Sequence, residues 1–350
     1  MSESHDIPPD LARYARQMRY PAIGVDGQRR LLNSRVLVVG CGALGSVLAN
    51  TLVRAGVGML RIVDRDFLEM NNLQRQMLYD EQDVRSGLPK AIVAKTHLER
   101  INAQVRVEAV VADVAQHNIG QLVEGVDLIV DGTDNFETRY LLNDAAIRWQ
   151  VPWVYGGCMG AEGQSMTILP GVTPCFRCLH PDPPPPGALE TCDSAGILAP
   201  IVNVIASLEA CEALKILTGH LEAVNRELQV FELWDNRVRQ VRLDALREHS
   251  QCPACVQRRF EWLTGERGGD TAVLCGRNAV QLSFPEQAAV SLAMLEARLE
   301  GIGPVTRNAY LLRLTLPAHQ ITVFPDGRAI IAGTEDLAEA RTLYARYVNV

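Results

Sequence analysis

The chain has 350 residues, of which 47% are hydrophobic and 21% charged, and its net charge is −7. This length allows two domains, and the balance of residue types excludes a disordered or fibrous protein. The acidic charge argues against nucleic-acid binding, which usually leaves a basic footprint. The polar N-terminus lacks the apolar stretch of a signal peptide, and the most apolar predicted helix, residues 199–217, contains several charges. We therefore expect a cytoplasmic protein that binds neither membranes nor nucleic acid.

Residues 11–20 are predicted to form a short helix that carries Arg13, Arg16 and Arg19. At a spacing of three, these side chains lie on one helical face. On composition alone, the simpler interpretation is a solvated charged surface.

A strand, a glycine turn and a helix follow each other from residue 35 to residue 64, and the rest of the chain is organised around them. The apolar run 36–39 predicts a buried parallel strand, and Gly40, Gly42 and Gly45 come next at the G-x-G-x-x-G spacing. A helix over 45–55 and a strand over 59–63 then lead to Asp64. Such a turn lets backbone N–H groups approach a phosphate, and the carboxylate can bind ribose hydroxyls. The pattern predicts a nucleotide site without specifying the nucleotide.

A long polar connection follows the second strand and carries two candidate phosphate ligands. Arg75 offers a planar guanidinium, and Lys90 opens a predicted helix over 91–101, where its charge opposes the helix dipole and favours a bound anion. Both residues could equally be surface cations. Connections at the carboxyl ends of parallel strands are where ligands bind in open sheets.

The predicted strand 128–130 runs into a second turn, Asp131-Gly-Thr-Asp134-Asn135. It should lie at the same sheet edge as the glycine turn, because both follow parallel strands. Asp134 is a candidate Mg²⁺ ligand beside a triphosphate. Alternatively, the Asp-Asn pair could cap the helix predicted over 137–150.

Two C-x-x-C pairs predict a metal site. Cys175 and Cys178 form the first pair, and Cys252 and Cys255 form the second, 74 residues after Cys178. Four thiolates in two such pairs are typical of a structural zinc site in which no ligand position remains for chemistry. The proline-rich segment 180–196 lies between the pairs, is predicted to be a loop, and carries Cys192.

Beyond a linker at 257–270, the sequence predicts a small α/β domain with no visible catalytic residues. Its expected elements are strands at 279–283, 310–316, 320–324 and 328–331, and helices at 285–299 and 334–347. Strands predicted at 106–111, 153–155, 164–169, 228–233 and 239–243 complete the first domain. The expected fold class is α/β, a Rossmann-like doubly wound mixed sheet with a Cys₄ zinc site, plus the small C-terminal domain. The expected division is 1–256 and 257–350.

Taken together, these motifs resemble the MoeB/ThiF/HesA family, bacterial relatives of the ubiquitin-activating enzymes. The resemblance covers roughly residues 11–256 and keeps the motif order. It rests on R-Y-x-R-Q at 13–17, the glycine turn, Asp64-x-Asp66, N-N-L-Q-R-Q at 71–76, G-x-P-K at 87–90, D-x-T-D-N at 131–135, the two C-x-x-C pairs and Thr191-Cys192.

The resemblance implies an ATP-dependent adenylyltransferase that activates the C-terminal glycine of a ubiquitin-like sulfur carrier, of the MoaD or ThiS type. It implies that Asp64 binds ribose, that Arg75 and Lys90 bind phosphates, and that Asp134 places Mg²⁺. Arg16 would enter the active site of the other subunit of a homodimer. The remaining nucleotide-site residues implied by the resemblance are Gly40, Gly42, Ala43, Gly45, Asp66, Asn71, Asn72 and Asn135.

Ala43 stands where relatives often have glycine, which affects one backbone contact to the nucleotide. Cys192 is a candidate acyl acceptor after adenylation; the alternatives are that it takes part in a persulfide exchange that loads sulfur, or that it is an incidental loop cysteine. A sulfur donor such as a cysteine desulfurase or rhodanese is an implied partner. The C-terminal 80 residues do not resemble a rhodanese domain.

Two other functions share part of this pattern. An NAD-dependent oxidoreductase would have the glycine turn and Asp64, but it gives no reason for Arg75, Lys90 and Asp134 beside a Cys₄ site. A non-catalytic carrier-binding scaffold would keep the zinc and the dimer but would lose the ATP-binding residues, which are intact here. The carrier and its pathway, whether molybdopterin, thiamin, another thiolated metabolite or tRNA, are not encoded in the motifs.

Overall fold

The structure, a computed structural model, describes residues 8–184, 195–248, 251–267, 278–282 and 290–348, together with the backbone of 271–274. The described residues form two compact units. The first contains those up to Pro184 and from Ile197 to Glu266, and the second contains residues 195–196 and those from Arg267 onwards. Each unit has its own sheet and its own hydrophobic core.

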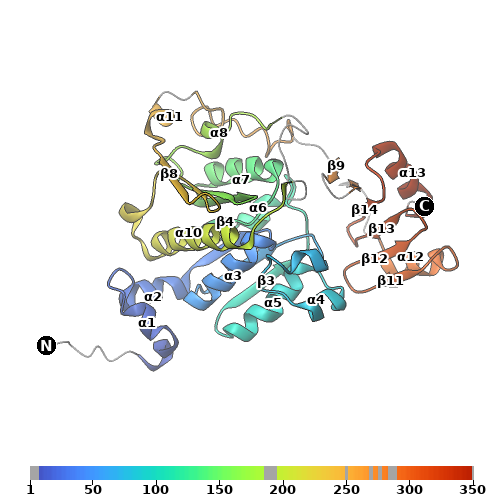
Figure 1. The fold of residues 1–350 in the computed structure, drawn as a ribbon, viewed down its shortest axis with the longest axis horizontal. Helices are drawn as coiled ribbons and strands as arrows, with labels where there is room; N and C mark the ends of the chain where they lie inside the picture. Colours follow the sequence, from blue (N-terminus) through green and yellow to red (C-terminus); the bar gives the residue numbers. More distant parts are fainter. Residues whose placement is uncertain are drawn as a thin grey trace. The chain divides into compact units, whose positions relative to one another are not determined.

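The first unit is built on an eight-stranded mixed sheet in the order β3-β2-β1-β4-β5-β6-β7-β8 (Figure 1). Pairs from β3 to β5 are parallel, and pairs from β5 to β8 are antiparallel. The strands are β1 (Arg35–Val39), β2 (Met59–Val63), β3 (Arg106–Val110), β4 (Leu128–Asp131), β5 (Trp153–Met159), β6 (Glu162–Ile168), β7 (Leu228–Glu232) and β8 (Arg237–Val241). The predicted mixed α/β sheet is confirmed.

Helices cover both faces of this sheet. They are α1 (Ala15–Met18), α2 (Gly24–Asn33), α3 (Ala43–Ala55), α4 (Glu81–Ser86), α5 (Lys90–Ile101), α6 (Ile119–Val123), α7 (Phe136–Trp149), α8 (Phe176–Leu179), α10 (Ala199–Thr218) and α11 (Asp244–Glu248). Short 3₁₀ helices span Pro9–Tyr14, Met70–Asn72 and Leu221–Ala223.

The two faces bury alternate residues of β1. Val36 and Val38 pack in a core with α3, α5 and α10, whereas Leu37 and Val39 pack in the other core with α6 and α7. Successive side chains of a strand point to opposite faces, so a strand covered on both sides is apolar throughout. This is why the uninterrupted run of apolar residues predicted the strand correctly.

The sheet places the functional turns at one edge. From β1 the chain continues to β2 and β3 on one side and later to β4 and β5 on the other, so strand order reverses between β1 and β4. Ligands of open α/β sheets bind at the carboxyl ends of the strands at such a reversal. The glycine turn follows β1, and the turn of residues 131–135 follows β4.

Some local elements differ from the sequence prediction. The helix predicted over 11–20 is a 3₁₀ helix, Pro9–Tyr14, followed by a single α-helical turn, α1. Helices α2 and α4 were not predicted. Helix α4 buries none of its side chains, so periodicity gave no signal for it, whereas α2 is amphipathic and its signal was missed.

The second unit contains a six-stranded antiparallel sheet in the order β11-β12-β13-β14-β10-β9. Its elements are β9 (Thr271–Leu274), β10 (Ala279–Leu282), α12 (Leu292–Leu299), β11 (Val305–Arg307), β12 (Leu312–Thr315), β13 (Gln320–Val323), β14 (Ala329–Ala332) and α13 (Leu337–Tyr347). The small α/β fold is confirmed, although β9 and β11 were not predicted. Residues 285–289 of the predicted helix 285–299 lie outside the described residues.

Among the described residues, no helix combines the length and the apolar character needed to cross a membrane.

Candidate active site and metal site

The glycine turn after β1 is packed tightly on one side and open on the other. Gly40 has φ +81°, and a Cβ there would lie 2.6 Å from the carbonyl oxygen of Gly132; a Cβ on Gly45 would collide with the carbonyl of Gly40. Both positions therefore require glycine. A Cβ on Gly42 would meet only the Gln76 amide nitrogen, at 3.8 Å. Packing does not require glycine at 42, so the absence of a side chain there leaves room for a ligand.

Asp64 joins the glycine turn to the end of β2. One of its carboxylate oxygens accepts a hydrogen bond from the backbone N–H of Cys41 at 2.6 Å, and the other accepts one from the backbone N–H of Asp66 at 2.7 Å. Burial raises the pKa of Asp64, and the nearby Lys90 ammonium opposes this shift. The carboxylate is thus held rigidly beside the first N–H groups of the turn.

Lys90 is buried at the start of α5, with 3% of its surface exposed. Its ammonium lies 3.5 Å from Oδ2 of Asp66. The hydroxyl of Tyr79 donates to the carbonyl of Cys41 at 2.8 Å and lies 3.4 Å from that of Lys90. Tyr79 therefore links the glycine turn to α5, and it was not predicted because a single tyrosine in a polar segment carries no motif signal.

Other residues of the polar connection organise its own backbone. Asn72 is buried and accepts the N–H of Glu69 at 3.1 Å, closing a capping box. Asn71 is exposed, and its side-chain oxygen accepts from the Asn72 amide at 2.9 Å. Arg75 is partly exposed and donates to the carbonyl of Asn71 at 2.8 Å.

The turn after β4 is shaped by a buried carboxylate. Oδ1 of Asp131 accepts from the N–H of Thr133 at 2.8 Å and from its hydroxyl at 2.7 Å. Burial raises the pKa of Asp131 to about 6, against the opposing charge of Arg139. The next two residues are exposed: Asp134 faces solvent, and Asn135 caps α7 by accepting the N–H of Thr138 at 2.8 Å. The capping interpretation thus holds for Asn135.

The structure brings most of the predicted nucleotide residues to one edge of the sheet. Gly40 packs against Gly132, Cys41 bonds to Asp64, and Asp66 pairs with Lys90. Ala43 is the first residue of α3, after Gly42 at the N-cap. Arg16 lies exposed on α1. Cys192 lies outside the described residues.

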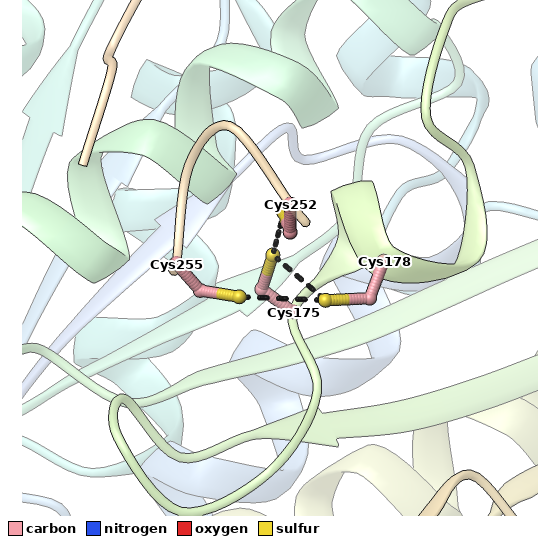
Figure 2. Close-up of side chains that lie close together, drawn as sticks. All are labelled: Cys175, Cys178, Cys252 and Cys255. Atoms are coloured by element: carbon pink, nitrogen blue, oxygen red, sulfur yellow. Dashed lines mark hydrogen bonds between the residues drawn. The ribbon is translucent and has the colours of Figure 1, made fainter. Parts of the chain in front are cut away.

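The four predicted metal-ligating cysteines converge (Figure 2). Their sulfur atoms all lie within 4.8 Å of one another. The distance is 3.5 Å from Cys175 to Cys252, 3.4 Å from Cys178 to Cys255, and 3.8 Å from Cys175 to Cys178. Tetrahedral zinc with Zn–S bonds of ~2.3 Å requires sulfur separations of ~3.8 Å, so the donor set fits a zinc ion.

Hydrogen bonding within the cluster favours the charged thiolate at two of the four positions. It lowers the pKa of Cys178 and brings that of Cys252 to about 7, whereas the pKa values of Cys175 and Cys255 are raised. Only the thiolate is a metal ligand.

The cysteine cluster is attached to α7 by buried polar contacts. The N–H of Phe176 donates to the Asn143 side chain at 2.9 Å. Arg177, which is 2% exposed, pairs with Glu261 at 3.0 Å and lies 4.0 Å from Asp144. Because α7 begins directly after Asn135, the cluster supports the helix that carries the second turn.

Three comparisons identify the relatives of this chain. The ThiF family profile matches residues 14–254. The chain is 42% identical over 338 residues to the sulfur carrier protein ThiS adenylyltransferase of Bacillus subtilis, covering 96% of this chain and 99% of the relative. It is 41% identical to a sulfur carrier protein adenylyltransferase of Thermus thermophilus, covering 70% of this chain and 91% of that protein.

The fold is also found in solved structures. The crystal structure of E. coli MccB superposes with a TM-score of 0.61 at 22% identity, covering 73% of this chain and 74% of MccB. At this identity the similarity shows the fold alone. The family profile and the curated relatives establish that the chain belongs to the ThiF family.

Proposed function

We propose that this chain uses ATP to adenylate the C-terminal glycine of a ubiquitin-like sulfur carrier, giving an acyl-adenylate and pyrophosphate. The observation that carries this proposal is the meeting of the open glycine turn, Asp64, Lys90 and the turn of Asp134 at one sheet edge. Relatives named as sulfur-carrier adenylyltransferases support the choice of substrate.

In the proposed reaction, a carboxylate oxygen of the carrier attacks the α-phosphorus of ATP. A carboxyl–phosphate bond forms, and the bond from the α-phosphorus to the bridging oxygen breaks, so pyrophosphate leaves. This step brings anions together, and catalysis therefore consists mainly of charge neutralisation and positioning. No nucleophile of the protein is required.

We assign the side chains to this step as follows. Asp64 binds the ribose, and Lys90 and Arg75 bind the phosphates. Asp134 would hold Mg²⁺, which would supply further positive charge at the phosphates. The backbone at Gly40, Gly42, Ala43 and Gly45 faces the nucleotide, and Asp66, Asn71, Asn72 and Asn135 support this site by the contacts described above.

For the cysteine cluster we propose one structural zinc ion, held by Cys175, Cys178, Cys252 and Cys255. All four ligand positions would be filled by sulfur, which leaves none for substrate. The ion would stabilise the fold around α7 rather than take part in adenylation.

We further propose a homodimer in which Arg16 serves the site of the other subunit, and a separate sulfur donor such as a cysteine desulfurase or rhodanese. We assign residues 1–256 to the ATP-binding adenylyltransferase domain and 257–350 to a linker and a small domain, and the linker residues 257–266 pack with the first unit. The Bacillus subtilis relative aligns over 338 residues, so this C-terminal extension is shared with at least one curated adenylyltransferase.

The proposal is tested by exchange of labelled pyrophosphate into ATP. Purified protein should catalyse exchange when given a carrier that ends in Gly-Gly, and the same carrier lacking its last glycine should not support it. Hydride transfer to NAD should be absent. A failure of exchange across a panel of such carriers, with Asp134→Ala indistinguishable from the unmodified protein, would refute the adenylation function.

A further inference from the structure

Glu209 is a carboxyl group sealed inside the first unit. It lies in the middle of α10, has 0% of its surface exposed, and faces β5 at Gly156. A Cβ on Gly156 would collide with the Glu209 carboxyl, so the glycine is what makes room for the acid. Neither carboxyl oxygen makes a hydrogen bond of ordinary geometry with the described residues. Buried acids without strong partners are rare, because a charged carboxylate is costly to remove from water.

Three titratable groups from three other elements interact electrostatically with this carboxyl group. They are Asp131 of β4, Arg139 of α7 and Tyr155 of β5. Helix α3, which also packs on α10, contributes apolar side chains and Ser46, whose hydroxyl is bonded to the Ala43 carbonyl at 3.1 Å. Burial raises the pKa of Glu209 well above its ordinary value, and Asp131 raises it further; Arg139 and the backbone N–H of Asp131 oppose the shift.

The single cation of this cluster lies nearer to the other acid. The Nε atom of Arg139 is 3.7 Å from Oδ2 of Asp131, an ion pair without a hydrogen bond between these two atoms. Its Nη2 atom donates to the carbonyl of Thr133 at 2.7 Å and to that of Gly156 at 3.3 Å. Two ionised carboxylates and one guanidinium would leave a net negative charge in a site that excludes water. One proton removes that charge, and Glu209, which lacks a close cation, is the acid that should hold it.

We propose that Glu209 stays protonated at neutral pH and is a positioning residue, which leaves Arg139 to pair with Asp131 and so fixes the turn of residues 131–135. An ionised Glu209 would compete with Asp131 for Arg139 and weaken the hydrogen bond from Arg139 to the Thr133 carbonyl. The consequence for catalysis rests on the proposed function, because the turn carries Asp134. The protonation itself does not, since it follows from the buried cluster alone.

The first test is thermal stability as a function of pH in the full-length protein. Above the ordinary pKa of about 4.5, unfolding releases the proton that folded Glu209 retains, so stability falls as pH rises towards the raised pKa of the folded state. Glu209→Gln mimics the neutral acid and lacks this loss. Its melting temperature should exceed that of the unmodified protein by a margin that widens from about pH 5 to about pH 8.

Glu212→Gln is the matched control, one turn further along α10. Glu212 is 6% exposed but pairs with Lys215 at 2.6 Å and accepts the N–H of Asn225 at 2.9 Å. Its replacement should lower the melting temperature, with no gain at high pH. A Glu209→Gln variant that is less stable than the unmodified protein, or whose margin is the same at every pH, would overturn the proposal.

Two further measurements separate protonation from catalysis. Infrared absorption of the unmodified protein at about pH 8 should show a protonated carboxyl that persists in Glu212→Gln and is lost in Glu209→Gln. Its absence from the unmodified protein would overturn the proposal even if the variant failed to fold. In the exchange assay, Glu209→Gln should retain more activity than Glu209→Asp, which keeps the acid but shortens it. If neither the unmodified protein nor its variants catalyse pyrophosphate exchange, but the stability and infrared results are as expected, the proposed function is refuted and the protonation of Glu209 is supported.

Discussion

Lys90 and Asp66 contact each other through both side chain and backbone. The Lys90 ammonium lies 3.5 Å from Oδ2 of Asp66, and the Lys90 N–H donates to the Asp66 carbonyl at 2.9 Å. These two contacts hold the ammonium in place beside the glycine turn. Preorganised charge of this kind lowers the barrier because it needs no rearrangement in the transition state.

Lys90→Ala should reduce carrier-dependent pyrophosphate exchange by about a hundredfold or more, because it removes a cation proposed to contact the phosphates. Lys95→Ala is the control on the same helix, since that side chain is 42% exposed and pairs with Glu99 at 3.7 Å. Its exchange rate should stay near that of the unmodified protein. Equal losses in both variants would mean that α5 is needed for folding and that Lys90 has no special role.

Asp134→Ala and Asn135→Ala should separate catalysis from helix capping. Asp134 is exposed, so its loss should lower the exchange rate by about a hundredfold and leave the melting temperature nearly unchanged. Asn135 caps α7, and its replacement should cost about 1 kcal/mol of folding free energy, visible as a lower melting temperature. The reverse pattern would contradict the assignment of Mg²⁺ binding to Asp134.

Strands β1 to β4 of the first unit could be predicted to within one residue, whereas β5 extends four residues beyond the predicted 153–155. Strand β2 matches the predicted 59–63, and β1 and β3 differ by a single residue at one end. The apolar run of β1 before Gly40 and the alternating pattern of β3 carry this information locally. The glycine turn, the acid at the end of β2 and the spacing of the cysteines are also local, which is why the motifs were visible.

The buried polar cluster was not predictable in the same way. Asp131, Arg139 and Glu209 come from β4, α7 and α10, and only the fold brings them together. In the sequence, Glu209 is one of several polar residues that interrupt an apolar helix, and nothing nearby distinguishes it from the ion-paired Glu212. One available signal was the pair Gly156-Gly157 directly after the predicted strand 153–155, because glycine in a strand can mark the close approach of another group.

Freshly purified protein should contain one zinc ion per chain. Cys252→Ser should lower both the zinc content and the melting temperature, because the free energy of zinc binding contributes to the stability of the folded state. Cys211→Ser is the control, since that thiol is exposed on α10. Metal analysis well below one zinc per chain, or equal behaviour of the two variants, would contradict the structural zinc site.

Arg16 should act across the proposed dimer. Arg16→Ala and Lys90→Ala subunits should each be nearly inactive alone. After mixing and subunit exchange, half of the dimers are mixed and one of their two sites has both residues, so about a quarter of the normal exchange rate should return. No recovery, with subunit exchange verified by mass, would indicate that each site is built from one chain.

Cys192 should be required after adenylation and not during it. The acyl-adenylate has an activated carbonyl, and a thiolate could attack it with formation of a carbon–sulfur bond and release of AMP, after the thiol proton has been lost. Proline-rich loops of this length inside enzymes commonly cover binding sites, which is the sequence-based reason to expect the thiol near the carrier tail. Cys192→Ser should therefore keep pyrophosphate exchange but reduce the yield of carrier thiocarboxylate, measured by mass spectrometry with a sulfur donor supplied. Cys211→Ser should leave both measurements unchanged. An undiminished thiocarboxylate yield in Cys192→Ser would show that sulfur reaches the acyl-adenylate without this thiol.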